Sequence, residues 1–209
     1  MARLTESKCT QCRRAGEKLF LKGDKCFGPK CPILKRNFPP GQHGPKQKHP
    51  KVSSYGKQLK EKQNVKRTYG LLERQFSNYV ASASAKTGDT SKILIQYLES
   101  RLDNVVYRMG LGKSRQAARQ MVNHGHITIN GKKVDIASYN VRVGEVVAVK
   151  ESDKKIKLFE GVSERLAKAT DLPGWLSVDA DKLSGKVLNT PSLDNASFNA
   201  KSIIEFYSR

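Results

Sequence analysis

Residues 114–134 have the sequence SRQAARQMVNHGHITINGKKV, and their pattern decides the fold of the middle of the chain. At 3.6 residues per turn, the first ten place alanine, methionine and valine on one side and arginine, glutamine and asparagine on the other. This predicts an amphipathic helix from Ser114 to Asn123, with Ser114 as its N-cap. The Asn130-Gly131 pair between two β-prone runs predicts a hairpin with a type I′ turn, because both central residues of that turn need positive φ.

The polar side of this predicted helix and the hairpin behind it form the first candidate RNA-binding surface. The helix N-terminus with Lys113 and Arg115 suits a phosphate, because its unpaired backbone amides carry partial positive charge. A cationic helix face is often merely solvated, but the histidines and lysines clustered at the hairpin favour binding. The candidates here are Lys113, Ser114, Arg115, Gln116, Arg119, Asn123, His124, His126, Asn130, Lys132 and Lys133.

A second candidate surface lies at a predicted helix start within 66–76. Helical periodicity begins near residue 51 and reaches 98, with apolar stripes typical of a core, and we expect a helix to continue from there to Gly110. Basic and amide side chains at 66–76 suit phosphate contacts, while Tyr69 fits either stacking on an unpaired base or burial in the core. The candidates are Lys66, Arg67, Tyr69, Arg74 and Gln75.

The four cysteines of the chain predict a metal site. They occur as Cys9-x-x-Cys12 and Cys26-x4-Cys31, and two such pairs can supply the four corners of a tetrahedron. Residues 1–50 hold too few large apolar side chains to close a core, so a bound metal would hold this segment together. The spacing does not separate zinc from an iron–sulfur cluster, and four reduced buried thiols are the alternative to both.

The net charge of the chain favours a polyanionic partner. The 209 residues carry a formal net charge of +20, and residues 1–67 contribute 18 basic and 4 acidic side chains. Such an excess suits nucleic acid and fits an enzyme for small neutral substrates poorly. In the first segment, turn formers and aromatics alternate with the basic residues, which indicates a segment that orders against a partner rather than a disordered tail. Further candidates there are Arg13, Arg14, Lys35, Arg36, His43 and Lys57.

Other classes of protein fit the sequence less well. No apolar run approaches the roughly 18–20 residues that a membrane helix needs, so we expect no membrane partner. The first residues lack the apolar stretch of a signal peptide, which predicts a reducing cytosol or an equivalent compartment. None of the four histidines stands in a metalloprotease pattern and no phosphate-binding loop is present, so we expect neither an enzyme nor a small-molecule substrate.

Several short motifs are similar to those of a known family. One set, typical of the S4-type RNA-binding domain, consists of 101–108, 114–119 and 122–127. A second set, typical of bacterial-type members of the ribosomal protein S4 family, consists of 38–44, 69–76, 173–176 and 205–209. The chain therefore resembles that family over essentially its full length, and its four cysteines resemble the metal-binding branch.

The residues and the resemblance together predict an α+β fold in four parts. Residues 1–45 are expected to form a basic extension stapled by a four-cysteine metal site. Residues 46–98 are expected to form a mainly helical RNA-binding domain, joined by the C-terminal tail from about 190 to 209. The S4-type domain, with short helices and a small antiparallel sheet, is expected to occupy 99–165. Residues 166–209 are expected to be a neutral scaffold segment.

The resemblance also implies a function in translation. It implies binding to 16S rRNA at a multi-helix junction of the 5′ domain, nucleation of the subunit body, and a place beside ribosomal protein S5 and other small-subunit proteins. It further implies a position near the channel by which mRNA enters, with an effect on translational accuracy, and it adds Arg108 to the candidate RNA contacts. The rivals are an RNA-modifying enzyme, a zinc-dependent DNA-binding regulator and a stress-induced ribosome-associated factor, but the flanking motifs favour a ribosomal protein of a bacterium or an organelle.

Overall fold

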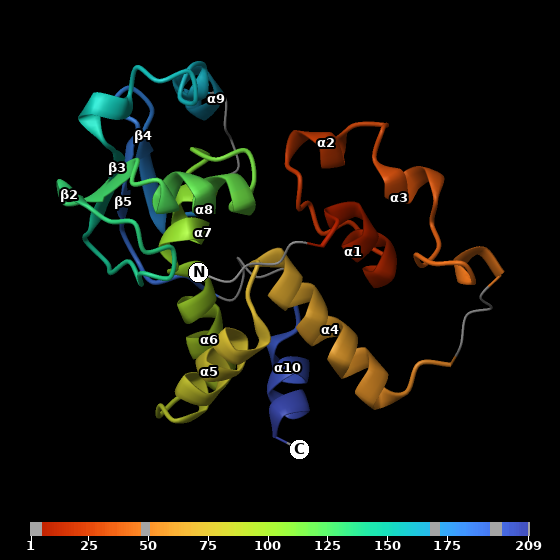
Figure 1. The fold of residues 1–209 in the computed structure, drawn as a ribbon. Helices are drawn as coiled ribbons and strands as arrows, with labels where there is room; N and C mark the ends of the chain where they lie inside the picture. The colour runs from red at the N-terminus through yellow and green to blue at the C-terminus, as the bar shows by residue number, and fades with distance from the viewer. Residues whose placement is uncertain (1–5, 47–50, 168–171, 193–197, 209) are drawn as a thin grey trace. The chain divides into compact units, whose positions relative to one another are not determined.

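The structure is a computed structural model that describes residues 6–46, 51–167, 172–192 and 198–208. It divides into two compact units, one made of Met1–Leu94 with Ala196–Arg209 and one made of Ile95–Asn195. The described part of the first unit is helical, and the second unit combines helices with a five-stranded antiparallel sheet (Figure 1). This mixture of helices and a small antiparallel sheet agrees with the α+β class predicted from the sequence.

Residues 6–46 form short helices around a very small core. The helices are α1 (Lys8–Ala15), α2 (Asp24–Phe27), α3 (Pro32–Lys35) and the 3-10 helix η1 (Gly44–Lys46). Cys12, Cys31 and Ile33 form a buried apolar cluster, and Leu19 and Leu21 pack against it. A core of this size agrees with the expectation that burial of apolar side chains contributes little to the stability of this segment.

Among the described residues, the rest of the first unit consists mainly of the helices α4 (Ser54–Thr68), α5 (Glu73–Ser84) and α10 (Ala200–Tyr207). Ser53 caps α4, because its hydroxyl oxygen accepts a hydrogen bond from the backbone amide of Gly56 at 3.2 Å. Helix α10 packs on α4 and α5 (Figure 1), and Phe76 of α5 and Ile203 of α10 are both fully buried. The end of the chain therefore completes the core of the first unit.

Helix α6 (Thr90–Glu99) leads into the second unit and ends at a bend. The prediction of one helix that continues to residue 110 is wrong, because Arg101 has extended backbone angles (φ −62°, ψ 135°) and α7 (Leu102–Arg108) begins after it. The bend is fixed from a distance, since the amide of Leu102 donates to the carbonyl of Tyr139 at 2.8 Å. A bridge to a remote segment thus replaces the hydrogen bonds of a continuous helix.

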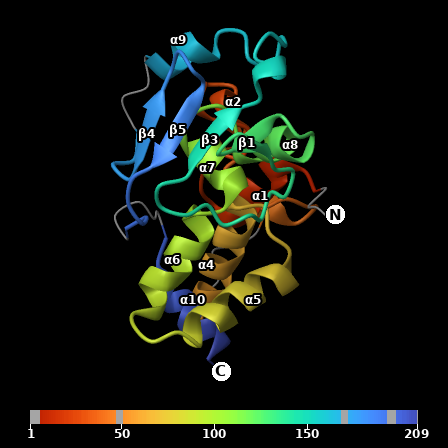
Figure 2. The ribbon, with the colours of Figure 1, turned by 90° about the vertical axis from the view of Figure 1, so that its left-hand side faces the viewer.

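The sheet of the second unit crosses the boundary predicted at residue 165. Its strands are β1 (Ile127–Ile129), β2 (Lys132–Lys133), β3 (Val146–Val149), β4 (Leu176–Asp179) and β5 (Ser184–Val187). All neighbours are antiparallel, in the order β2-β1-β3-β5-β4, and Figure 2 shows β3, β5 and β4 side by side. Because β5 covers the edge of β3 that β1 leaves unpaired, part of the segment predicted to begin at 166 belongs to this sheet.

Short helices accompany the sheet, namely α7, α8 (Arg115–Asn123), the 3-10 helix η2 (Glu151–Asp153) and α9 (Val162–Ala167). One apolar cluster joins α7, α8 and α9 to the strands. Leu102, Val105, Val106, Met109, Ala118, Met121, Val122, Ile127, Ile129, Val147, Val149, Phe159, Val162 and Leu166 are all buried in it. The apolar side of α8 is therefore buried, which confirms that this helix is amphipathic.

Candidate RNA interface

The helix and the hairpin predicted from residues 114–134 are both present. The hydroxyl oxygen of Ser114 caps α8 by accepting a backbone amide of the first turn at 3.2 Å. Asn130 and Gly131 have φ values of 49° and 80°, the positive values that a type I′ turn needs. The side-chain oxygen of Asn130 also accepts the amide of Val146 at 2.9 Å, so the turn is tied to the neighbouring strand.

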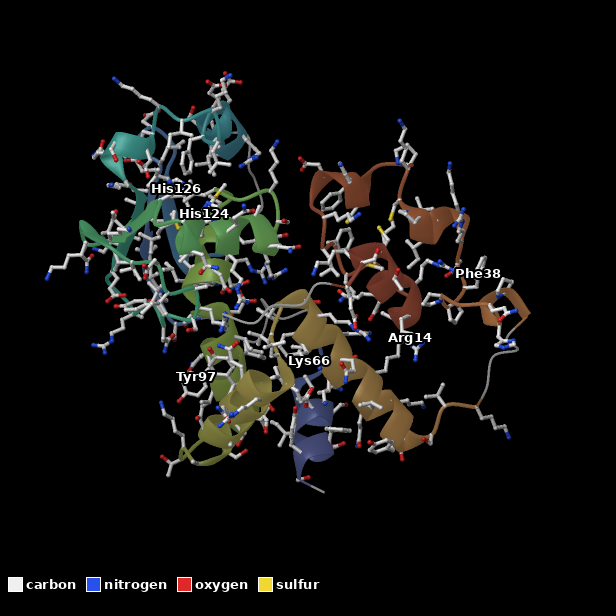
Figure 3. The ribbon with its side chains drawn as sticks, viewed as in Figure 1. Arg14, Phe38, Lys66, Tyr97, His124 and His126 are labelled. Atoms are coloured by element: carbon white, nitrogen blue, oxygen red, sulfur yellow. The ribbon has the colours of Figure 1, made fainter. Side chains whose placement is uncertain are left out.

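Two histidines follow α8 and differ in their surroundings. His126 lies with Nδ1 2.8 Å from Oδ2 of Asp153, and its ring meets Phe159 edge-on at a centroid distance of 6.1 Å. The hydrogen bond from His126 lowers the pKa of Asp153. His124 is exposed, with its ring 6.1 Å from that of His126 (Figure 3). His126 thus connects β1 to η2, while His124 faces solvent.

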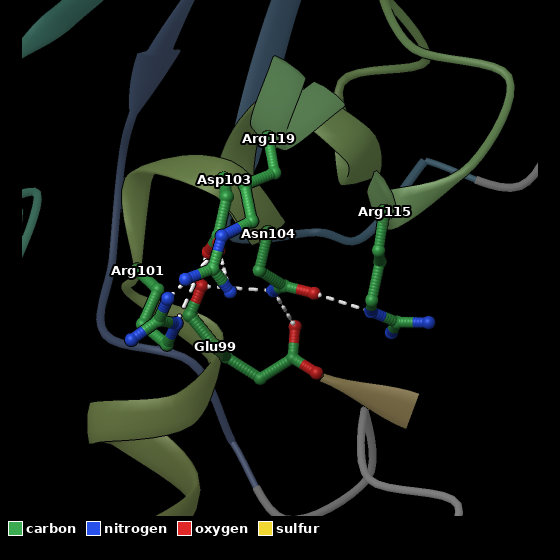
Figure 4. Close-up of polar contacts among 6 residues, drawn as sticks. All are labelled: Glu99, Arg101, Asp103, Asn104, Arg115 and Arg119. Carbon is green, nitrogen blue, oxygen red and sulfur yellow. Dashed lines mark hydrogen bonds and ion pairs between the residues drawn. The ribbon is translucent and has the colours of Figure 1, made fainter. Parts of the chain in front are cut away.

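A buried polar network lies beneath α8 (Figure 4). Glu99 is fully buried and accepts hydrogen bonds from Nδ2 of Asn104 at 2.8 Å and from Nε and Nη2 of Arg108 at 2.9 and 2.8 Å. The side-chain oxygen of Asn104 accepts a hydrogen bond from Nε of Arg115 at 2.8 Å. Because a buried carboxylate requires such partners, Glu99 holds Arg108 directly and reaches Arg115 through Asn104.

A second acidic residue, Asp103, pairs with two other arginines of the same region. Arg101 is 1% exposed and donates through Nε and Nη2 to both carboxylate oxygens of Asp103, at 3.0 and 2.7 Å. Nη1 of Arg119 lies 3.7 Å from Asp103. The helical projection of residues 114–123 places Arg119 on a face open to RNA, whereas the structure gives it an acidic partner on α7, which a projection of one helix does not include.

Arg13 of the first unit has contacts within the protein. Its Nε and Nη2 donate to the carbonyls of Phe38 and Pro39 at 3.1 and 3.2 Å, and its guanidinium lies 4.7 Å from the ring centroid of Phe38. Arg14, the next residue, is exposed (Figure 3). Arg13 therefore fastens the turn at 38–39, and Arg14 is the better placed of the two for a partner.

Lys66 belongs to an ionic cluster between three helices of the first unit. It donates to Glu73 at 2.8 Å, and the same carboxylate accepts Lys62 at 2.5 Å and the hydroxyl of Tyr207 at 2.7 Å. Burial raises the pKa of Glu73, but the hydrogen bonds from Lys62, Lys66 and Tyr207 outweigh it and lower the pKa to about 2. The cluster joins α4, α5 and α10.

Tyr69 is buried in the core, which is the second of the two roles predicted for it. It is 5% exposed, and its ring meets that of Phe198 edge-on at 6.2 Å. Burial of this side chain in the core of the first unit leaves no ring face for a base to stack on, so the base-stacking interpretation does not fit the structure.

The remaining candidates differ mainly in exposure. The exposed ones are Arg14, Lys35, Arg36, His43, Lys57, Arg74, Lys113, Gln116, Asn123, His124, Asn130, Lys132 and Lys133. The half-buried ones are Arg13, Lys66, Arg67, Gln75, Arg108, Ser114, Arg115, Arg119 and His126. In the second unit the exposed candidates come from the two ends of α8 and from the hairpin, so they belong to neighbouring stretches of one domain.

The four cysteines line one pocket at α1, α2 and α3 as free thiols. The pKa of Cys12 is raised, chiefly because the thiol is buried and also because the other three thiols lie near it. A backbone hydrogen bond from Leu19 acts in the opposite direction and lowers the pKa in part. Across the described ranges, no group of three or more His, Cys, Asp or Glu side chains is arranged to hold a metal ion. The all-sulfur donor set suits zinc or an iron–sulfur cluster in chemistry, but the side-chain geometry does not form a finished ligand cluster.

In the described residues no helix is long and apolar enough to span a bilayer.

Comparison with known proteins places the chain in a family. The family model of the ribosomal protein S4/S9 N-terminal domain matches residues 3–99, and that of the S4 domain matches residues 100–147. The chain is 52% identical to small ribosomal subunit protein uS4A of Symbiobacterium thermophilum and 50% identical to uS4 of Acetivibrio thermocellus and of Koribacter versatilis, over 100% of every chain. This chain belongs to the ribosomal protein S4 family.

The polar network of this S4-family chain includes residues that the sequence reasoning did not select. Glu99 and Asn104 have no place among the predicted contacts, although both occur where the apolar periodicity of a core helix continues around them. Charged and amide side chains at core positions are rarely buried without partners. That mismatch between periodicity and residue type is the signal that identifies such residues in a sequence.

Proposed function

We propose that this S4-family chain is a structural protein of the small ribosomal subunit that binds 16S rRNA and catalyses no reaction. The observation that carries the proposal is the 52% identity, over the full length of both chains, to a protein named for that subunit. The net charge of +20 supports a polyanionic partner.

The second unit offers a surface suited to a folded RNA. Lys113 stands before the capped N-terminus of α8, where unpaired amides and the helix dipole favour a phosphate. Lys132 and Lys133 are exposed on the hairpin. Lysines and a helix end of this kind neutralise phosphates and fix orientation, and folded RNA is recognised largely by shape.

The proposed function includes a specific position of the protein in the small subunit. The chain binds a multi-helix junction of the 5′ domain of 16S rRNA and nucleates the subunit body, in the cytoplasm or in an organelle. Its neighbours are ribosomal protein S5, other small-subunit proteins and mRNA near the channel by which it enters, and the contact with S5 affects translational accuracy. The family resemblance supports these statements.

The test is sedimentation of a cell extract through a sucrose gradient after a high-salt wash, with a blot for the protein. An integral ribosomal protein stays with the small subunit, because many phosphate contacts and a large interface hold it. Recovery of the protein only at the top of the gradient refutes the proposal and favours a loosely bound factor that shares the domain.

A structural metal site at Cys9, Cys12, Cys26 and Cys31 is part of the proposal, with zinc preferred and a 4Fe-4S cluster as the alternative. All four thiols line the same pocket, and the segment has little core of its own. A thiolate-bound metal would stabilise the folding of such a segment. Elemental analysis of the protein purified without added metal is expected to give about one zinc per chain. Cys26→Ser is expected to lose it, whereas Thr10→Ala on the same segment keeps it, and metal-free wild-type protein refutes the site.

A further inference from the structure

We propose that Asn104, held by the buried carboxylate of Glu99, is a positioning residue for RNA binding: it fixes the guanidinium of Arg115 in the orientation that meets the RNA. This inference rests on the proposed RNA-binding function. On this view the arginines of the second unit have different roles. Arg115 presents its charge to RNA, whereas Arg101 and Arg108 balance the buried carboxylates of Asp103 and Glu99.

Glu99 has a fixed position in the buried network. It is fully buried at the end of α6, and both of its carboxylate oxygens accept hydrogen bonds from Arg108 in a two-pronged contact. A buried carboxylate with this many charge-assisted bonds has little freedom to move, since any displacement leaves a charge unpaired in a medium of low polarity. Glu99 is therefore a rigid anchor for whatever else it holds.

Glu99 determines which way the amide of Asn104 faces. Nδ2 of Asn104 donates both to Oε2 of Glu99 at 2.8 Å and to the backbone carbonyl of Glu99 at 3.0 Å. A side-chain amide has two N–H donors on its nitrogen and only an acceptor on its oxygen. With the nitrogen committed to two acceptors of Glu99, the oxygen must face away from them, and it points to Nε of Arg115 (Figure 4).

Two contacts hold the guanidinium of Arg115, one at Nε and one on its face. Oδ1 of Asn104 accepts its Nε at 2.8 Å, and the ring of Tyr107 lies under the guanidinium with 4.6 Å between its centroid and Cζ. A stacked guanidinium with Nε hydrogen-bonded retains one plane. The two Nη atoms then lie on the side away from Asn104 (Figure 4).

Pre-orientation of this kind affects affinity because an arginine has many rotamers. Immobilising such a side chain on binding weakens an interface by roughly twofold to tenfold, and a side chain that is already ordered avoids this loss. Removing the support at Asn104 should therefore weaken RNA binding although the charge of Arg115 is still present. The number of phosphates neutralised, and with it the salt dependence, should stay the same.

The experiment is a double-mutant cycle with the full chain and a transcript of the 16S rRNA 5′ domain as the probe. Dissociation constants are measured at several salt concentrations for wild type, Arg115→Ala, Asn104→Ala and the double variant. Arg115→Ala should weaken binding and lower the salt slope by about 1. Asn104→Ala should weaken binding roughly twofold to tenfold at an unchanged slope, and it should have almost no further effect in the Arg115→Ala background.

Equal effects of Asn104→Ala in both backgrounds, or no effect in either, overturn the inference, because a purely structural role would not depend on Arg115. Asn140→Ala, an exposed asparagine of the same unit, is the matched control and should bind as wild type does. If circular dichroism shows that Asn104→Ala does not fold, RNA binding by variants of Tyr107 tests the inference instead. Tyr107→Leu should weaken binding while Tyr107→Phe restores it, and equal binding by both overturns the inference.

The same measurements separate this inference from the function on which it rests. Wild-type protein that binds the 5′ domain transcript no better than a duplex RNA of equal length overturns the proposed function together with the inference. Wild-type protein that prefers the transcript, combined with a cycle that shows no coupling between residues 104 and 115, overturns the inference alone.

Discussion

Replacement of Glu73 by glutamine should loosen the attachment of the last helix to the first unit. The carboxylate of Glu73 on α5 accepts Lys62 and Lys66 of α4 and the hydroxyl of Tyr207 on α10, at 2.5, 2.8 and 2.7 Å. The amide of Glu73→Gln keeps the shape of the side chain but removes the charge that all three donors face. We therefore expect the variant to lose electrostatic stabilisation without a change in packing.

The size of the effect follows from the pKa of Glu73 and its exposure. A lowering of the pKa from 4.5 to about 2 corresponds to a ceiling of about 3.4 kcal/mol. The side chain is 48% exposed, so solvent screening reduces this to about 1.5 kcal/mol. For a unit of this size that is roughly 6–12 °C in Tm. Because folding lowers the pKa, the stabilisation is complete above pH 4.5 and is lost as the pH falls towards 2.

The assay uses two signals that report different units. Trp175 is the one tryptophan of the chain and is buried in the second unit, so its fluorescence follows that unit. Far-ultraviolet circular dichroism follows the helices, including those of the first unit. At pH 7 the Tm of Glu73→Gln, measured by circular dichroism, should be lower than that of wild type. The difference in Tm should be smaller at pH 2.5. Coincident melting of the two proteins at pH 7, or a difference that is undiminished at pH 2.5, would refute the reasoning.

Three further predictions test other parts of the structure. Ser114→Ala removes the N-cap of α8 and should destabilise the second unit by about 1 kcal/mol, measured by Trp fluorescence in urea; an unchanged midpoint contradicts the cap. Lys132→Ala with Lys133→Ala removes two exposed charges, and should lower the salt slope of RNA binding by about 2 at unchanged Tm; an unchanged slope excludes both from the interface. Phe76→Ala leaves a cavity at a fully buried position and should destabilise the first unit by about 3–5 kcal/mol, so a smaller loss than 1 kcal/mol contradicts its place in the core.

Local patterns in the sequence were sufficient for the elements that depend on neighbours in the chain. The helix from residue 114, its serine cap and the positive φ of Asn130 and Gly131 are all encoded within a few residues of one another. The start of the C-terminal helix Ala200–Tyr207 is encoded locally as well, since the side-chain oxygen of Asn199 accepts the amide of Ser202 at 3.3 Å. Each of these features depends on capping, turn geometry or periodicity, which act over one or two turns.

Features that depend on remote partners were not predictable in this way. The helix break at Arg101 is caused by a hydrogen bond from Leu102 to Tyr139, and the sheet acquires β5 by pairing of Val147 with Gly185. Neither contact can be read from local periodicity, because its two partners are separated by more than thirty residues along the chain. The position of the candidate arginines has the same origin, because Arg119 faces an acidic residue on α7 that a projection of α8 omits.

The acidic partners have a consequence for how this protein binds RNA. A count of basic side chains overstates the phosphate contacts of the second unit, since Arg101 and Arg108 already neutralise buried carboxylates at 2.7 and 2.8 Å. Moving Arg101 to a phosphate would leave Asp103 with the 3.7 Å contact of Arg119, and moving Arg108 would remove both of its hydrogen bonds to the buried Glu99. Weakening the pairing of a buried carboxylate in this way is more unfavourable than one phosphate contact is favourable. Each phosphate that a cation neutralises contributes roughly 0.7–0.9 to the salt slope. The slope should therefore follow the exposed lysines and Arg115, and it should be smaller than the number of basic residues in the domain.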